Sequence, residues 1–95
     1  MSHPVRHDEK ALRFIIDIDG KEALLAYSQK GTVLDFYRTY VPEELRGRGL
    51  AEEVVKAGFA YAKEKGLTVR PSCPYISQTF LKRHKEYENL LDKSF

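Results

Sequence analysis

The hydrophobic pattern of this chain changes its period at Gly49, and that change limits the folds the chain can adopt. In residues 12–18, before Gly49, apolar and polar side chains alternate, a period of two that predicts a β-strand. Between Gly49 and Gly66 the apolar residues recur every three or four positions, which predicts one long amphipathic helix. We therefore expect a β-sheet joined to a helix through a short glycine-rich connection.

Three strands are expected before this connection, at residues 12–18, 22–29 and 33–41. Asp19-Gly20 is a strong hairpin signal between the first two, and Lys30-Gly31 marks a second turn. Pro42 ends the third strand because proline lacks the N–H group that a β-ladder needs. The three strands should form an antiparallel meander.

A fourth strand, residues 67–72, follows the long helix. The order strand, helix, strand normally gives a right-handed crossover and a parallel strand pair. Pro74 suits the first position of a second, shorter helix, and a further helical turn is expected at residues 87–91. The sequence therefore predicts an α+β fold: a mixed, mostly antiparallel four-stranded sheet, one long amphipathic helix and a short C-terminal helical segment.

Length and composition indicate one small domain of ordinary charge. The 95 residues divide into a polar, flexible N-terminus (residues 1–10) and a single folded domain (residues 11–95). Sixteen Lys and Arg against fourteen Asp and Glu give a net charge of +2, which makes nucleic acid an unlikely partner. One cysteine, Cys73, excludes an internal disulfide and fits a reducing compartment. No apolar run is long enough for a membrane span, so we expect a cytoplasmic protein.

The connection itself, Arg46-Gly47-Arg48-Gly49-Leu50-Ala51, has the chemistry of an anion site. Glycine permits a tight turn and a close approach of the backbone to a ligand. The first turn of a helix offers free N–H groups and the positive end of the helix dipole. Arginine adds charge-assisted hydrogen bonds. This loop is suited to a phosphoanhydride.

The loop also resembles the acetyl-CoA loop of the GNAT acetyltransferase superfamily, whose pattern is Arg or Gln, two residues, Gly, one residue, then Gly or Ala. Arg46, Gly49 and Ala51 occupy the three defined places. With the segments Pro-Ser-Cys-Pro-Tyr (71–75) and Arg-His-Lys-Glu-Tyr (83–87), the chain resembles the minimal single-domain branch of the superfamily over residues 12–91. Longer members carry further elements that help to build the acceptor pocket, and this chain has no room for them.

The resemblance implies a set of site residues. The loop would hold the pyrophosphate of acetyl-CoA, and the main chain at the end of the third strand would pair with the pantetheine arm, which gives the cofactor-binding residues Tyr40, Val41, Arg46, Gly47, Arg48, Gly49, Leu50 and Ala51. The acetyl group would point toward Cys73, and Tyr75 could protonate the departing sulfur. Minimal members often carry a histidine late in the third strand, but no histidine lies there in this chain.

Two mechanisms are compatible with these residues. In direct transfer, a deprotonated amine attacks the thioester, and Asp35 and His84 are the candidate bases. Alternatively, Cys73 takes the acetyl group first, because a cysteine at a helix N-terminus gains thiolate character. Each residue also has a structural reading: Cys73 as a small buried apolar group, Tyr75 as a packed aromatic ring and His84 as solvated surface.

The sequence therefore predicts an acetyl-CoA-dependent N-acetyltransferase with an amine or protein lysine as acceptor and no metal. A second hypothesis is a CoA-binding or acyl-CoA-sensing module without turnover. A third is a phosphate-loop module that recognises nucleic acid through Arg46, Arg48, Lys82, Arg83 and Lys85, which the mild net charge and the lack of an aromatic stacking pattern oppose. The acceptor and the oligomeric state are left open.

Overall fold

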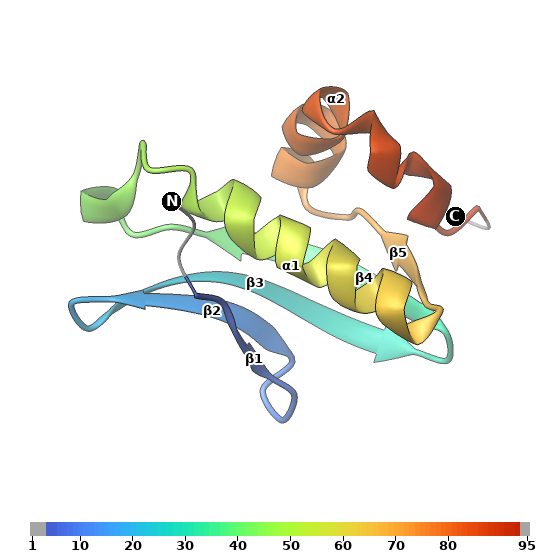
Figure 1. Ribbon diagram of the computed structural model, residues 1–95, viewed down its shortest axis with the longest axis horizontal. Coiled ribbons are helices and arrows are strands. Elements are labelled where there is room, and N and C mark those ends of the chain that lie inside the picture. The colour runs from blue at the N-terminus through green and yellow to red at the C-terminus, as the bar shows by residue number, and fades with distance from the viewer. Residues whose placement is uncertain (1–3, 94–95) are drawn as a thin grey trace.

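A five-stranded sheet carries one long helix on one of its faces (Figure 1). The computed structural model describes residues 4–93 of the chain. The strands are β1 (Arg6–Asp8), β2 (Arg13–Ile18), β3 (Lys21–Lys30), β4 (Val33–Tyr40) and β5 (Thr68–Arg70), in that order across the sheet. The first three pairs are antiparallel, whereas β4 and β5 are parallel. The predicted mixed sheet and its parallel pair are thus confirmed.

The strand count is a correction, because the sheet has five strands and not four. The additional strand, β1, lies in the segment for which we expected flexibility; residues 1–3 of that segment lie outside the described residues. The polar composition concealed it. In the structure, the His7 ring stacks on Phe14 at 4.1 Å between centroids, and Arg6 forms an ion pair with Asp17 at 3.1 Å. These contacts hold a strand that alternation alone does not reveal.

The turns follow from residues that tolerate left-handed backbone. Asp19 and Gly20, with φ values of 52° and 78°, form the two-residue loop between β2 and β3. The helix α1 (Leu50–Lys65) ends at Gly66, whose φ of 69° and N–H bonds to Ala62 and Lys63 close the last turn. Among residues 4–93, no helix combines the length and the apolar character needed to cross a bilayer.

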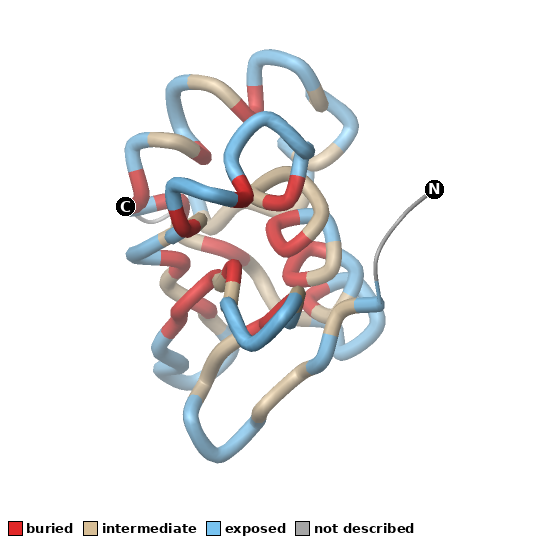
Figure 2. Tube along the Cα trace, turned by 90° about the vertical axis from the view of Figure 1, so that its left-hand side faces the viewer, coloured by how far each residue is buried: buried red, intermediate tan, exposed pale blue. Residues whose placement is uncertain are grey.

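The core lies between α1 and the sheet, where the buried residues gather (Figure 2). Gly58 marks the closest approach of the helix to the strands. A Cβ atom there would lie 2.8 Å from both Leu25 Cδ2 and Phe36 Cζ. The absence of a side chain at this position therefore lets α1 settle on β3 and β4.

The C-terminal helical segment lies beside α1 on the same side of the sheet (Figure 1). It begins at Pro74, passes through a π-helical turn, η2 (Ile76–Phe80), and a short helix, α2 (Leu81–Arg83), and ends in a 3₁₀ helix, η3 (Lys85–Leu90). Phe59 of α1 stacks on Phe80 at 5.7 Å and on Tyr87 at 4.9 Å between ring centroids. The predicted short C-terminal helices are confirmed, and aromatic packing fixes them against α1.

Candidate functional site

The connection between β4 and α1 is a compact loop with two left-handed glycines. It begins with a single 3₁₀ turn, η1 (Glu43–Leu45), whose Leu45 side chain is buried in the core. Gly47 and Gly49 have φ values of 85° and 74°, a conformation that glycine adopts without strain. Arg46 Nε donates a hydrogen bond to the Val41 carbonyl at 3.1 Å, and its backbone N–H donates to the Glu43 carbonyl at 3.3 Å, so Nε is the part of the guanidinium that the described residues hold. The two Nη groups of Arg46 are therefore available to a ligand.

The loop leads directly into the N-terminus of α1. Gly49 occupies the N-cap position, and no side chain of the described residues caps the helix start. The first N–H groups of a helix have no acceptor within the helix, and the helix dipole places a partial positive charge there. The start of α1 therefore offers N–H donors to an anion.

A groove with a volume of about 240 Å³ lies over this helix start. It is lined by the residue that follows β4, by the loop, by the first turn of α1 and by two residues of the C-terminal segment. The lining residues are Val41, Leu45, Arg46, Gly47, Gly49, Leu50, Ala51, Glu52, Tyr75 and Arg83.

Most of the residues that the sequence predicted for the cofactor line this groove. Val41, Arg46, Gly47, Gly49, Leu50 and Ala51 do so, whereas Tyr40 and Arg48 do not. The Tyr40 ring is 41% exposed and lies 5.5 Å from the guanidinium carbon of Arg38. Arg48 is also exposed. Of the two arginines proposed for the phosphates, the structure brings only Arg46 to the groove.

Cys73 occupies the expected N-cap of the second helix but not the groove. Its carbonyl accepts hydrogen bonds from the N–H groups of Ile76 and Ser77, at 3.0 and 3.1 Å. The side chain is only 5% exposed, and Sγ lies 2.9 Å from Thr39 Oγ1 on β4. The thiol is thus packed between β4 and the helix, within the core and away from the lining of the groove.

Tyr75 does line the groove, together with Arg46 and the start of α1. Burial raises the pKa of the phenol above its ordinary value of 10.0, and the negative charge of Glu52 adds to that effect. The phenol therefore stays protonated at neutral pH, as a proton donor must.

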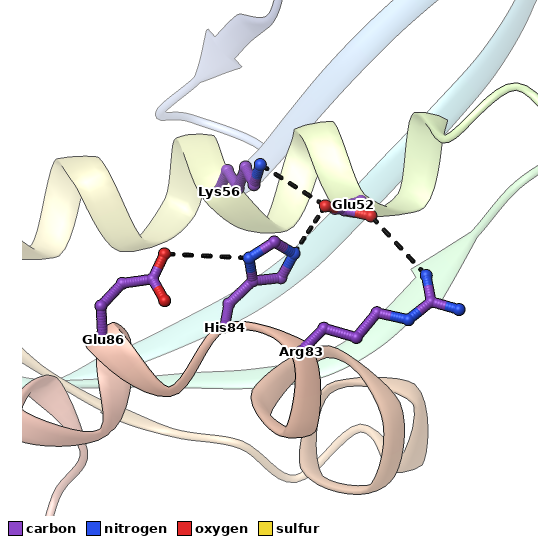
Figure 3. Close-up of polar contacts among 5 residues, drawn as sticks. All are labelled: Glu52, Lys56, Arg83, His84 and Glu86. Atoms are coloured by element: carbon purple, nitrogen blue, oxygen red, sulfur yellow. Dashed lines mark hydrogen bonds and ion pairs between the residues drawn. The ribbon is translucent and has the colours of Figure 1, made fainter.

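A carboxylate at the edge of the groove holds a network that sequence reasoning missed (Figure 3). Glu52 Oε1 accepts a hydrogen bond from His84 Nε2 at 2.5 Å and lies 3.4 Å from Lys56 Nζ, while Oε2 lies 3.9 Å from Arg83 Nη1. Glu86 lies 3.8 Å from His84 Nδ1. Burial would raise the pKa of Glu52, but the hydrogen bonds from His84 and Lys56 outweigh it and hold the pKa below its ordinary value.

The position of His84 corrects our reading of it as solvated surface, because its side chain is only 17% exposed. A signal for this was present: His84 follows Ile76 and Phe80 at intervals of four, and residues four apart share a helix face. The contacts of Glu52 with Arg83 and His84 have no signal in the sequence, because the partners are distant along the chain.

Asp35, the other candidate base, lies away from the groove. It lines a separate hollow of about 300 Å³ together with Ser28, Lys30, Val33, Arg70 and Asp92. Within residues 4–93, no group of three or more His, Cys, Asp or Glu side chains is placed to hold a metal ion. Of the residues predicted for the site, Tyr75 and six of the cofactor-binding residues line the groove, whereas Cys73, Asp35, Tyr40 and Arg48 do not.

Known proteins resemble this chain in sequence and in fold. The sequence model of the GCN5-related N-acetyl-transferase family matches residues 13–90. Protein NATD1 of Bos taurus is 34% identical over 83 residues, covering 84% of this chain and 73% of that protein. Protein NATD1 of Danio rerio is 36% identical over 88 residues, covering 87% and 79%.

A solved structure shares the fold. The NMR solution structure of a GCN5-like protein from Staphylococcus aureus superposes with a TM-score of 0.71 at 24% identity, covering 97% of this chain and 91% of that one. At this level of identity the likeness speaks for the fold alone, whereas the match of the family model spans most of the sequence. The chain belongs to the GCN5-related N-acetyltransferase family.

Proposed function

We propose that this protein binds acetyl-CoA in the groove and transfers the acetyl group to an amine, either a small molecule or a protein lysine. The observation that carries the proposal is the groove itself. It combines the uncapped start of α1, two left-handed glycines and the Nη groups of Arg46 with the protonated phenol of Tyr75.

The donors fit a diphosphate. Apart from the immediate chain neighbours, no described residue has an atom within 4 Å of the place where a Cβ of Gly47 or Gly49 would stand, so the backbone of the loop is open to a ligand. N–H groups of a helix start together with a guanidinium are the donors that bind phosphates in proteins.

The diphosphate alone does not account for useful affinity. A charge at a helix N-terminus contributes roughly 0.3–1 kcal/mol, whereas micromolar binding needs about 8 kcal/mol. The pantetheine arm has a place to bind, because β5 pairs with β4 only from Val33 to Asp35 and β4 continues to Tyr40. Beyond the last β5 pair, Phe36 O accepts the Cys73 N–H at 2.9 Å. The amides of the arm would add to this edge of β4 as a short strand does.

The groove favours direct transfer over an acetyl-cysteine intermediate. Tyr75 lines the groove and would donate its proton to the sulfur as the carbon–sulfur bond breaks, while the neutral amine forms the new carbon–nitrogen bond. The nitrogen then loses one proton through solvent, and the tyrosinate takes up a proton in its place. Cys73 is buried away from the lining of the groove, so we assign it to packing. A cysteine packed in a core commonly behaves as a small apolar side chain.

The decisive experiment compares two substitutions that carry the same strain and the same charge. Gly49→Glu introduces bulk and a negative charge at the helix start, whereas Gly31→Glu does so at a hairpin, where φ is 61° and the space is equally open. By calorimetry, we expect Gly49→Glu to weaken CoA binding by about 100-fold or more, which corresponds to about 2.7 kcal/mol, and Gly31→Glu to leave it unchanged. Equal affinity in the two variants would refute the location of the site.

One observation favours a non-catalytic CoA-binding module as the second candidate. Glu52 is the one carboxylate among the lining residues, and hydrogen bonds hold its pKa low, so it is a weak base. Mass spectrometry after incubation with labelled acetyl-CoA and a lysine peptide distinguishes the two. Acetyl on the peptide supports the enzyme, and intact acetyl-CoA that binds tightly supports the module.

A further inference from the structure

The groove has a second cationic wall, supplied by the C-terminal segment. Arg83 lines it opposite the loop that carries Arg46. The Arg83 side chain is 68% exposed, and its nearest charged neighbour is Glu52, 3.9 Å away. Exposed ion pairs of this length contribute little to stability, so Arg83 can leave Glu52 for another anion at small cost.

The direction of Arg83 is set by the helix that carries it. In a regular α-helix, residues eight apart such as Tyr75 and Arg83 are offset by roughly 80° around the axis. The π-helical turn η2 lies between them, and there the Leu81 N–H bonds to the Ile76 carbonyl five residues earlier. A wider turn rotates each residue by less, which offsets the difference. Both side chains consequently reach the same groove.

His84, the next residue, fixes that helix to α1. Its Nε2 bonds to Glu52 Oε1 at 2.5 Å, and its ring lies 4.7 Å from the Phe80 ring. Glu52 keeps His84 and Lys56 as partners if Arg83 moves away. The carboxylate therefore anchors the helix through His84 and does not depend on its contact with Arg83.

We propose that Arg83 is a second phosphate-binding residue of the cofactor and that the His84–Glu52 hydrogen bond positions it. This inference rests on the proposed function, because it requires a nucleoside diphosphate in the groove. It differs from the alternative in which Arg83 is a solvated partner of Glu52 and touches no ligand.

The test measures binding by calorimetry with two probes, CoA and an acetyl-pantetheine that lacks every phosphate. Arg83→Ala should weaken CoA binding by about tenfold or more, the effect expected for a lost charge-assisted contact. Lys82→Ala removes the same charge one residue away, at an exposed position outside the groove, and should change the affinity less than about twofold. Neither variant should alter binding of the uncharged probe.

Positioning by His84 has its own readout. His84→Ala should weaken CoA binding severalfold, and His84→Gln should restore most of it, because the Gln amide can donate to Glu52 as Nε2 does. In the double variant Arg83→Ala, His84→Ala the losses should not add, since both act through one side chain. Full additivity would show that His84 does not act through Arg83.

The outcomes separate this inference from the proposed function. If the unmodified protein does not bind CoA, the proposed function fails and this inference fails with it. If the unmodified protein binds CoA and Arg83→Ala matches Lys82→Ala, the role of Arg83 is overturned while the cofactor site stands. A melting temperature for each variant confirms that the measured chain is folded.

Discussion

Two histidines fasten the two ends of the described chain to its centre, and they do so in opposite surroundings. His7 of β1 stacks on Phe14, lies edge-on to Tyr61 of α1 and bonds through Nε2 to the Tyr27 hydroxyl at 2.5 Å. His84 bonds to a carboxylate, Glu52, at the other end of α1. One histidine thus sits among neutral rings, and the other closes a network of charges.

With the proposed function, the surroundings of His7 are expected to bear on stability, and those of His84 on ligand binding as well. Burial lowers the pKa of His7, and burial together with the nearby Tyr61 raises the pKa of Tyr27 to about 12, so both groups stay neutral over the physiological range. None of these side chains lines the groove. Glu52 lines it. If the groove binds CoA as we propose, contacts of the C-terminal segment should be coupled to ligand binding, whereas those of β1 should bear on stability alone.

The largest effect is expected when one buried ring in each of the two regions is replaced by alanine. Phe14→Ala and Phe80→Ala should each lower the free energy of unfolding by about 3–5 kcal/mol, because both rings are almost fully buried. Only Phe80→Ala should also weaken CoA binding, since the Phe80 ring packs against His84. Denaturant unfolding and calorimetry at low temperature measure the two effects.

The rise in melting temperature on adding CoA tests the same two variants. CoA should raise the melting temperature of Phe14→Ala by as much as that of the parent protein, and that of Phe80→Ala by less. Equal shifts in both variants would break the proposed distinction between the two regions.

A smaller effect is expected at Gly58, midway between the two regions. Alanine gains about 1 kcal/mol of helix propensity over glycine, but its Cβ would stand 2.8 Å from Leu25 and Phe36, and overpacking costs about 1–3 kcal/mol. We expect Gly58→Ala to lower the free energy of unfolding by up to about 2 kcal/mol and to leave CoA affinity unchanged. A stabilised Gly58→Ala variant would mean that the core beneath α1 yields more readily than the contacts indicate.

The smallest effect is a pH dependence carried by His7. Burial depresses the pKa of His7 in the folded protein below its ordinary value of 6.5, so the unfolded chain binds a proton first as the pH falls. The stability contributed by neutral His7 is complete above pH 6.5 and is lost as the pH falls through the folded pKa. Unfolding at pH 7.5 and pH 5 should show a smaller acid loss for His7→Gln than for the parent, and identical losses would exclude His7 as the source.

The central part of the fold could be predicted from local pattern. Alternation predicted β2, aromatic and β-branched residues predicted β4, Asp19-Gly20 predicted the hairpin, and Gly66 predicted the end of α1, because each signal lies within a few residues. The strand β1 was not predicted, because its stability comes from contacts of His7 with Phe14 and Tyr27, which lie on the next two strands. A polar composition does not reveal a ring that is buried by distant partners.

In the candidate site, too, residues close together in sequence could be predicted, and contacts between distant residues could not. The glycines and Arg46 could be predicted because the loop is continuous in sequence and its chemistry is local. The pairing of Glu52 with Arg83 could not be predicted, because the two residues are brought together by the docking of one helix on another. Cys73 suggested chemistry by its place at a helix start, but whether a thiol faces solvent or core depends on packing that no short motif contains.

The π-helical turn Ile76–Phe80 lets the C-terminal segment carry one residue more than an ordinary helix of the same span. In a relative that lost one residue there and regained ordinary helical spacing, the positions of Tyr75 and Arg83 would be seven residues apart, which is within about 20° of one helix face. A gap at the turn would therefore keep both side chains on the same side, whereas a gap between the turn and the arginine would rotate the guanidinium by about 100°. In an alignment of this family, the place of a single gap in this segment is thus worth more attention than many substitutions.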